Sequence, residues 1–107
     1  MRRTVRVSGD AIGDIENIYR YIAEHGGVTI ADSVVDALER RIAQLSELSE
    51  RGNYPKELAA VDNKEYRELH YKPYRIIYSI ETNHVMILAV LDGRRDIAAL
   101  LQRRLRL

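Results

Sequence analysis

The stretch YRELHYKPYRIIYSIETNHVMILAVLDGRRD, residues 66–96, decides the fold. Tyr66–Tyr71 and Tyr74–Glu81 both alternate in side-chain character with the period of a β-strand. Lys72-Pro73 separates these two runs, because proline lacks a backbone donor and disfavours helix in the residue before it. Val85–Leu91 is continuously apolar, which is typical of a central strand covered on both faces. Three consecutive strands with short turns predict an antiparallel meander.

Two amphipathic helices are predicted before this meander. Apolar side chains recur at helical spacing over residues 12–22 and again over residues 31–48. Gly26-Gly27 lies between them and is suited to end the first helix, since glycine readily adopts the left-handed turn at a helix C-terminus. Ser8 or Asp10 can cap the start of that helix. We therefore expect a helical hairpin packed on one face of the sheet.

The remaining segments complete an α+β fold. Arg2–Val7 alternates and predicts a short strand, suited by its charge to a sheet edge. Arg51–Asn63 carries Gly52, Asn53 and Pro55 and predicts a loop, and residues 97–105 predict a short last helix. The expected order is N-terminal strand, helical hairpin, three-stranded meander and C-terminal helix. The 107 residues are expected to form a single domain, residues 1–107.

Composition excludes several classes of protein. The chain has no cysteine, so disulfide scaffolds, thiolate metal sites and cysteine nucleophiles are excluded. The three histidines lie far apart, and we expect no metal and no other cofactor. The longest apolar run is much shorter than the roughly 20 residues that span a membrane, and no apolar stretch follows the basic N-terminus. A cytoplasmic protein without a membrane partner is expected.

Charge is distributed unevenly along the chain. Residues 1–63 hold eight Lys and Arg against eleven Asp and Glu, whereas residues 64–107 hold nine against five. The net charges of −3 and +4 agree with the total of +1 for the whole chain. Such a basic half is able to contact nucleic acid or an acidic protein, although a solvated surface explains it equally well.

The candidate functional residues are mainly cationic. There is no glycine-rich phosphate loop, no G-x-S-x-G elbow and no paired-histidine metal motif. Arginine binds phosphate through two parallel hydrogen bonds, and tyrosine stacks on bases. The candidates for binding a target lie in the meander, after its last strand and in the last helix: Arg67, Tyr71, Lys72, Arg75, Arg94, Arg95, Arg103 and Arg104.

Each candidate also has a structural explanation. Arg75 is expected on the strand face opposite Tyr74 and Tyr78, where a salt bridge to Glu68, Glu81 or Asp92 explains it as well as a functional role does. Tyr74 and Tyr78 share their face with isoleucines, which favours core packing. His70 is more often a partly buried strand residue than a general base.

The segments YRELHYKPYRIIYSIE (66–81) and ILAVLDGRRDIAALLQRRL (87–105) resemble the RelE/ParE superfamily of bacterial type II toxin–antitoxin toxins. The segment AIGDIENIYRYIAEH (11–25) is similar to the first helix of that superfamily. The resemblance implies a toxin, of the plasmid-stabilisation type, that is neutralised by a cognate antitoxin. It also implies that the antitoxin wraps a segment, often acidic, around the toxin, which would suit the basic half of this chain.

The superfamily divides in mechanism. RelE-like members cut messenger RNA on the ribosome, and ParE-like members inhibit DNA gyrase. The RNA-cutting pattern has two lysines on the first meander strand and a tyrosine in the last helix, but the corresponding positions here are Arg67, Leu69 and Leu100 or Leu101. Its two arginines match Arg75 and either Arg94 or Arg95. HYKPYRIIY and LDGRRD also look closer to ParE-like sequences.

Three hypotheses follow from this resemblance. The first is a gyrase inhibitor that blocks replication, which needs a contact surface rather than a catalytic centre. The second is a metal-independent, ribosome-dependent endoribonuclease with mRNA as substrate, whose catalytic residues would be Arg75, Arg94, His70 and Arg67. The third is an inert relative kept for antitoxin binding. The missing tyrosine and lysines favour the first.

Overall fold

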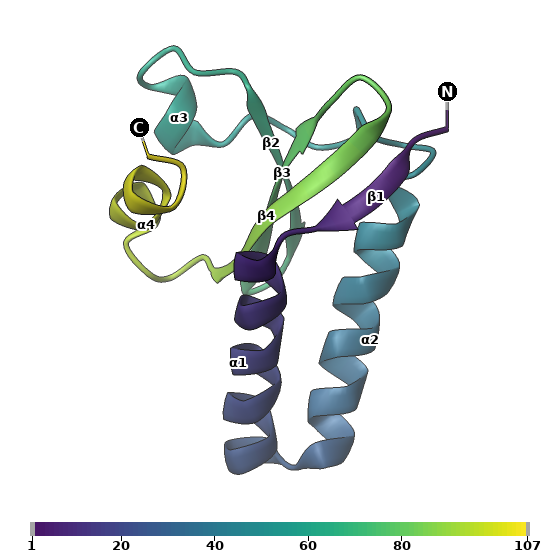
Figure 1. The fold of residues 1–107 in the computed structure, drawn as a ribbon. Coiled ribbons are helices and arrows are strands. Elements are labelled where there is room, and N and C mark those ends of the chain that lie inside the picture. The colour runs from purple at the N-terminus through teal and green to yellow at the C-terminus, as the bar shows by residue number, and fades with distance from the viewer. Residues whose placement is uncertain (1, 107) are drawn as a thin grey trace.

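The computed structural model describes residues 2–106 and confirms the predicted α+β architecture (Figure 1). Its elements in chain order are β1 (Thr4–Val7), α1 (Gly9–Gly26), α2 (Val28–Gln44), α3 (Lys56–Ala59), β2 (Tyr66–Tyr71), β3 (Tyr74–Ile80), β4 (His84–Asp92) and α4 (Ile97–Arg104).

The four strands form one sheet in the order β1-β4-β3-β2. β2, β3 and β4 are the predicted antiparallel meander, with Tyr71 paired to Tyr74 and Tyr74 paired to Asp92. β1 is an edge strand, as its charges predicted, and it pairs in parallel with β4 through Val5 and Val85. The apolar run in β4 is therefore central.

Helices cover both faces of this sheet. The α1–α2 hairpin packs on one face and encloses the larger core, in which Leu38, Ile76 and Tyr78 are fully buried. α3 and α4 lie together on the other side (Figure 1). They enclose a second core around Ile77 and Leu101. The two faces of β3 thus supply both cores, which explains why Ile76 and Ile77 are both buried.

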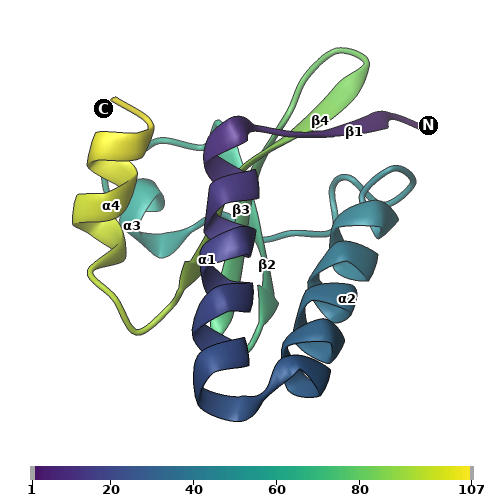
Figure 2. The ribbon, with the colours of Figure 1, turned by 60° about the horizontal axis from the view of Figure 1, so that its bottom comes forward.

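The hairpin begins and turns as predicted (Figure 2). The Ser8 side chain accepts a hydrogen bond from the Ala11 amide at 3.1 Å and caps α1. α1 ends at Gly26, and Gly27 has a φ of 97°, a conformation that side chains rarely adopt. This turn places the two helices side by side.

The segment Arg51–Asn63 is more ordered than the predicted loop. Lys56–Ala59 forms α3, one short helix that starts after Pro55. Leu58 from this helix is buried in the second core. Four residues are too few to show helical periodicity, so the loop prediction was wrong here. Anchoring α3 brings Glu57 against the sheet.

The hydroxyl of Tyr78 explains the packing of the neighbouring loop. It donates to the Ser49 carbonyl at 2.8 Å and accepts from the Gly52 amide at 2.9 Å. A Cβ atom at position 52 would meet this hydroxyl and the Glu68 carbonyl oxygen, each at 2.5 Å. Core packing is therefore the role of Tyr78, whereas Tyr74 is half-buried at the sheet end.

No helix in residues 2–106 has the length and apolar character needed to cross a lipid bilayer.

Candidate functional site

Arg75 lies in a compact ion-pair cluster. Its guanidinium donates to the Glu68 carboxylate at 2.5 and 3.1 Å and to the Glu57 carboxylate at 2.7 Å twice. The exposed fractions of the Arg75, Glu57 and Glu68 side chains are 11%, 15% and 3%. We call these three residues the Arg75 cluster. It joins α3 to strands β2 and β3.

The electrostatics of the Arg75 cluster favour its charged form. The hydrogen bond from Arg75 lowers the pKa of Glu57. The pKa of Arg75 is raised, first by its bond to Glu57 and then by Glu68, against the opposing effect of burial. Two carboxylates against one guanidinium leave the cluster with a negative net charge. This arrangement favours the salt-bridge explanation of Arg75 over phosphate binding.

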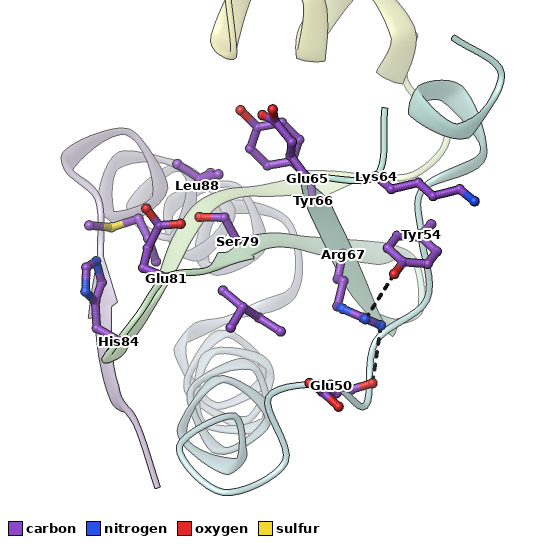
Figure 3. Close-up of a pocket in the computed structure, with 12 residues that line it drawn as sticks. Glu50, Tyr54, Lys64, Glu65, Tyr66, Arg67, Ser79, Glu81, His84 and Leu88 are labelled. Carbon is purple, nitrogen blue, oxygen red and sulfur yellow. Dashed lines mark hydrogen bonds between the residues drawn. The ribbon is translucent and has the colours of Figure 1, made fainter. Parts of the chain in front are cut away.

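Arg67 does not converge with Arg75. It faces Tyr78 across β2 and β3, on the opposite face of the sheet. Its guanidinium donates to the Tyr54 hydroxyl at 3.1 Å and lies 4.6 Å from the Tyr54 ring centre (Figure 3). It also donates to the Gly52 carbonyl at 2.9 Å. Arg67 therefore supports the loop that precedes α3.

The pocket in Figure 3 is the one beside Arg67. It has a volume of about 640 Å³ and lies where β2 begins, β3 ends and β4 begins. Both cationic and acidic side chains line it: Lys64 and Arg67 together with Glu50, Glu65 and Glu81. Such a mixture does not select a ligand of one charge.

No group of three His, Asp or Glu side chains in residues 2–106 is arranged to hold a metal ion.

His70 lies beside the Arg75 cluster, because its ring and the Arg75 guanidinium both contact Oε1 of Glu68. It is opposite Arg75 in the strand register, and its Nε2 lies 3.3 Å from the Glu68 carboxylate. Its side chain is 53% exposed, at the outer strand of the sheet. Four residues are required for the ribonuclease hypothesis. His70 and Arg75 lie together on one face of the sheet, Arg67 lies on the opposite face, and Arg94 follows the end of β4.

A second group of the predicted residues does converge, at the end of the sheet where β2 turns into β3. The turn carries exposed Lys72 between Tyr71 and Tyr74, and the Gly93 amide donates to the Pro73 carbonyl at 2.7 Å. This bond fixes the end of β4 beside the turn. Arg94 and Arg95 follow directly and are exposed.

α1 contributes an aromatic residue to the same place. Tyr21 is 64% exposed and stacks on His25 with ring centres 4.2 Å apart. A cleft of about 300 Å³ separates α1 from the strand end and is lined by both Tyr21 and Tyr74. We call Tyr21, Lys72, Tyr74, Arg94 and Arg95 the sheet-end surface.

Arg94 is held by a neighbour in its own turn. It donates to the two Asp92 carboxylate oxygens at 2.9 and 2.5 Å, and this bond lowers the pKa of Asp92. The Arg94 side chain is nevertheless 78% exposed. One weakly buried carboxylate leaves its guanidinium accessible to a ligand, in contrast to Arg75.

The two arginines of α4 differ from each other. Arg104 is 22% exposed and donates to the two Asp14 carboxylate oxygens at 2.9 and 3.1 Å. This bond ties α4 to α1, and the hydrogen bond that Arg104 donates to Asp14 raises the pKa of Arg104. Arg103 is exposed on α4. The predicted target-binding set therefore divides into internal ion pairs and exposed cations.

The sequence prediction included no candidate residue from the first half of the chain. Tyr21 lies outside the apolar stripe of α1, and an exposed tyrosine beside such a stripe was the available signal. Arg41 of α2 was also missed. It lies 5.5 Å from the Tyr71 ring centre and donates to the His70 carbonyl at 2.7 Å. Neither of these two contacts of Arg41 is local in sequence.

An apolar groove runs along the outside of the hairpin. It has a volume of about 440 Å³ and lies between β1, α1 and α2. Ile12, which is 49% exposed, contributes to it with Val5 and Ile15, and its rim carries Glu16 and Glu39.

Fold and surface together define a small α+β protein, in which a helical hairpin packs on a sheet, exposed cations lie at the strand end, and an apolar groove lies beside the hairpin. Residues 5–97 match the family described as ParE toxin of type II toxin–antitoxin system, parDE. The chain belongs to this family, and the resemblance to the RelE/ParE superfamily, closer to its ParE-like members, is confirmed.

Individual relatives agree with this assignment. The chain is 29% identical over 87 residues to Toxin ParE3 of Caulobacter vibrioides, covering 81% of this chain and 83% of that protein. Its fold is similar to a chain in the chromosomal ParDE toxin–antitoxin system of P. aeruginosa, with a TM-score of 0.70 and 15% identity. That match covers 83% of this chain and 94% of the other.

Proposed function

We propose that this toxin inhibits DNA gyrase through a contact made by the sheet-end surface. The observation that carries the proposal is the separation of the predicted cations into internal ion pairs and exposed residues. Arg94 is 78% exposed, whereas Arg75 is bound by two carboxylates. A contact surface needs accessible arginine and tyrosine, which are also the residue types enriched at binding hot spots.

The division of the candidate cations into internal ion pairs and exposed residues also argues against RNA cleavage. A metal-independent ribonuclease needs a base, an acid and cations within reach of one phosphate. Here Arg75 is occupied, Arg67 lies on the other face, and His70 lies beside Glu68. His70→Ala should therefore leave toxicity unchanged, and its loss in a folded variant would favour the ribonuclease instead.

The partner that controls the toxin is a cognate antitoxin, as membership of the family implies. We propose that part of the antitoxin covers the apolar groove beside Ile12 and Ile15. Covering this groove removes apolar surface from water and would drive an otherwise disordered segment to order on the toxin. Because gyrase acts on chromosomal and plasmid DNA, we place the action of the toxin in the cytoplasm.

The direct test is a supercoiling assay with purified gyrase. Wild-type toxin should inhibit supercoiling, and the double variant Arg94→Ala/Arg95→Ala should inhibit it at least about tenfold less, as expected for loss of exposed contact cations. Arg40→Ala is the matched control, because Arg40 is an exposed arginine on α2. Full supercoiling in an excess of wild-type toxin would contradict the proposal.

A further inference from the structure

Gly93 lies against the aliphatic stem of Arg75 at the end of the sheet. A Cβ atom at position 93 would meet Cδ of Arg75 at 3.1 Å, Cγ of Arg75 at 3.4 Å and the Pro73 carbonyl oxygen at 3.1 Å. The φ of Gly93 is not in the left-handed region, so the reason for glycine here is lack of space. The Arg75 stem therefore occupies the place in which a side chain at position 93 would lie.

The Arg75 side chain is fixed at both of its ends. Its Cα lies in β3, opposite Leu91 of β4 in the strand register. Its guanidinium makes four hydrogen bonds, to Glu57 of α3 and to Glu68 of β2. Because the side chain is held in this way and is only 11% exposed, its stem has little freedom to move away from Gly93.

Gly93 belongs to the turn that carries Arg94 and Arg95. The Arg95 amide donates to the Asp92 carbonyl at 3.1 Å, and the Arg94 amide donates to the Asp92 carboxylate at 2.9 Å. The Gly93 amide donates to the Pro73 carbonyl at 2.7 Å. The turn is thus closed by its own hydrogen bonds and is attached to the neighbouring β2–β3 turn at Gly93.

We propose that Arg75 is a positioning residue for the sheet-end surface. Its stem holds Gly93, and with it the turn 92–95, in the conformation in which Arg94 and Arg95 contact the target. The proposal rests on the proposed function of the sheet-end surface, but it assigns to Arg75 no contact with the target. A turn that is ordered before binding loses less conformational entropy when the complex forms.

The guanidinium and the stem of Arg75 then have separable roles. The guanidinium compensates two largely buried carboxylates, and its removal lowers stability. The uncharged stem contacts Gly93. Arg75→Met keeps a stem of similar length without the charge, whereas Arg75→Ala removes both. A role in stability alone predicts that these two variants behave alike, because both leave Glu57 and Glu68 unpaired.

Amide hydrogen exchange tests the positioning role without any target. Exchange of the Gly93 amide, measured by NMR on the full-length toxin, should be at least about tenfold faster in Arg75→Ala than in Arg75→Met, because the stem no longer opposes local opening of the turn. The Val90 amide, which donates to Asp14 at 2.9 Å on the same strand, should exchange equally in both variants. It controls for a difference in overall stability.

A neutral background keeps this comparison possible if either variant fails to fold. In Glu57→Gln/Glu68→Gln the partners of Arg75 carry no charge, so replacing the arginine leaves no buried carboxylate uncompensated. Arg75→Met and Arg75→Ala are then compared within that background. The same difference in Gly93 exchange is expected.

Supercoiling by purified gyrase tests the consequence for function. Arg75→Ala should need about fivefold more toxin for half-inhibition than Arg75→Met does. In the Arg94→Ala/Arg95→Ala background the two Arg75 variants should inhibit alike, because the stem acts through these two arginines.

Equal exchange of the Gly93 amide in Arg75→Ala and Arg75→Met would overturn the proposal. Equal inhibition by the two variants would overturn it as well, and so would a difference that persists without Arg94 and Arg95. If wild-type toxin does not inhibit gyrase, the proposed function fails by itself. Gly93 exchange, together with colony counts after induction of the two variants, then decides whether the Arg75 stem positions the turn for another target.

Discussion

Arg75 and Arg94 lie in the same basic half of the chain but in opposite environments. Arg75 is 11% exposed and is bound by two carboxylates from α3 and β2. Arg94 is 78% exposed and is bound by one carboxylate from its own turn. Residue type therefore does not distinguish an arginine held in a buried ion pair from one that stays exposed. Burial and the number of acidic partners do.

The two environments of Arg75 and Arg94 predict different effects of substitution on stability. Removing a buried partner leaves other charges without compensation, while removing an exposed one leaves them in water. Stability should therefore depend on the Arg75 cluster, and binding should depend on the sheet-end surface. The following substitutions test that division, beginning with the largest expected loss of stability.

Arg75→Ala should lower the free energy of unfolding by about 3 kcal/mol, because it leaves Glu57 and Glu68 unpaired in a largely buried place. Urea denaturation measures the change. Arg40→Ala, which removes an exposed arginine, should stay within about 0.5 kcal/mol of the wild type. Equal losses in the two variants would contradict the assignment of Arg75 as structural.

Gly52→Ala should lower the free energy of unfolding by about 2 kcal/mol, since the new Cβ meets the Glu68 carbonyl and the Tyr78 hydroxyl. The strand that carries the Arg75 cluster would have to shift. Gly13→Ala in α1 is the control, because its Cβ meets nothing within 4 Å and alanine favours a helix. Thermal denaturation should show a lower melting temperature for the first variant and an unchanged or higher one for the second.

Acid should weaken the Arg75 cluster in a predictable direction. Because Arg75 lowers the pKa of Glu57 in the folded chain, the ionised carboxylate stabilises the fold above the ordinary pKa of about 4.5. This stabilisation is lost as the pH falls through the lower folded pKa. Unfolding free energies measured between pH 6 and 3 should fall less steeply in Glu57→Gln than in the wild type. Parallel curves would show that Glu57 is not coupled to Arg75.

Arg94→Ala should change the free energy of unfolding by less than about 0.5 kcal/mol, as is usual for an exposed ion pair. It should nevertheless reduce growth arrest when the toxin is expressed without antitoxin. Colony counts after induction, together with urea denaturation of the purified variant, separate the two effects. An unfolded Arg94→Ala variant would make this arginine structural.

The sequence predicted the fold well because its signals are local. The alternation of β2 and β3, the apolar run of β4 and the glycines between α1 and α2 each act within a few residues. The parallel pairing of β1 with β4 and the short helix α3 were missed. The first depends on contacts between chain ends, and the second is anchored by Leu58 in a core that only the complete fold creates.

The candidate site was predicted less completely, for the same reason. Lys72, Arg94 and Arg95 are exposed, and each follows a strand or turn that the sequence marks, but their role in target binding stays a prediction. The pairing of Arg75 with Glu57 spans 18 residues, and that of Arg104 with Asp14 spans 90. No local pattern reports such contacts, so these arginines could not be separated from the exposed ones in advance.

We propose that this ParE-family toxin acts on DNA replication through an exposed surface. The incorporation of labelled thymidine and labelled amino acids, measured within minutes of inducing the toxin without its antitoxin, tests this directly. We expect an early loss of thymidine incorporation while amino-acid incorporation continues, and a weaker loss with Arg94→Ala. Early loss of amino-acid incorporation, or no loss of either, would contradict it.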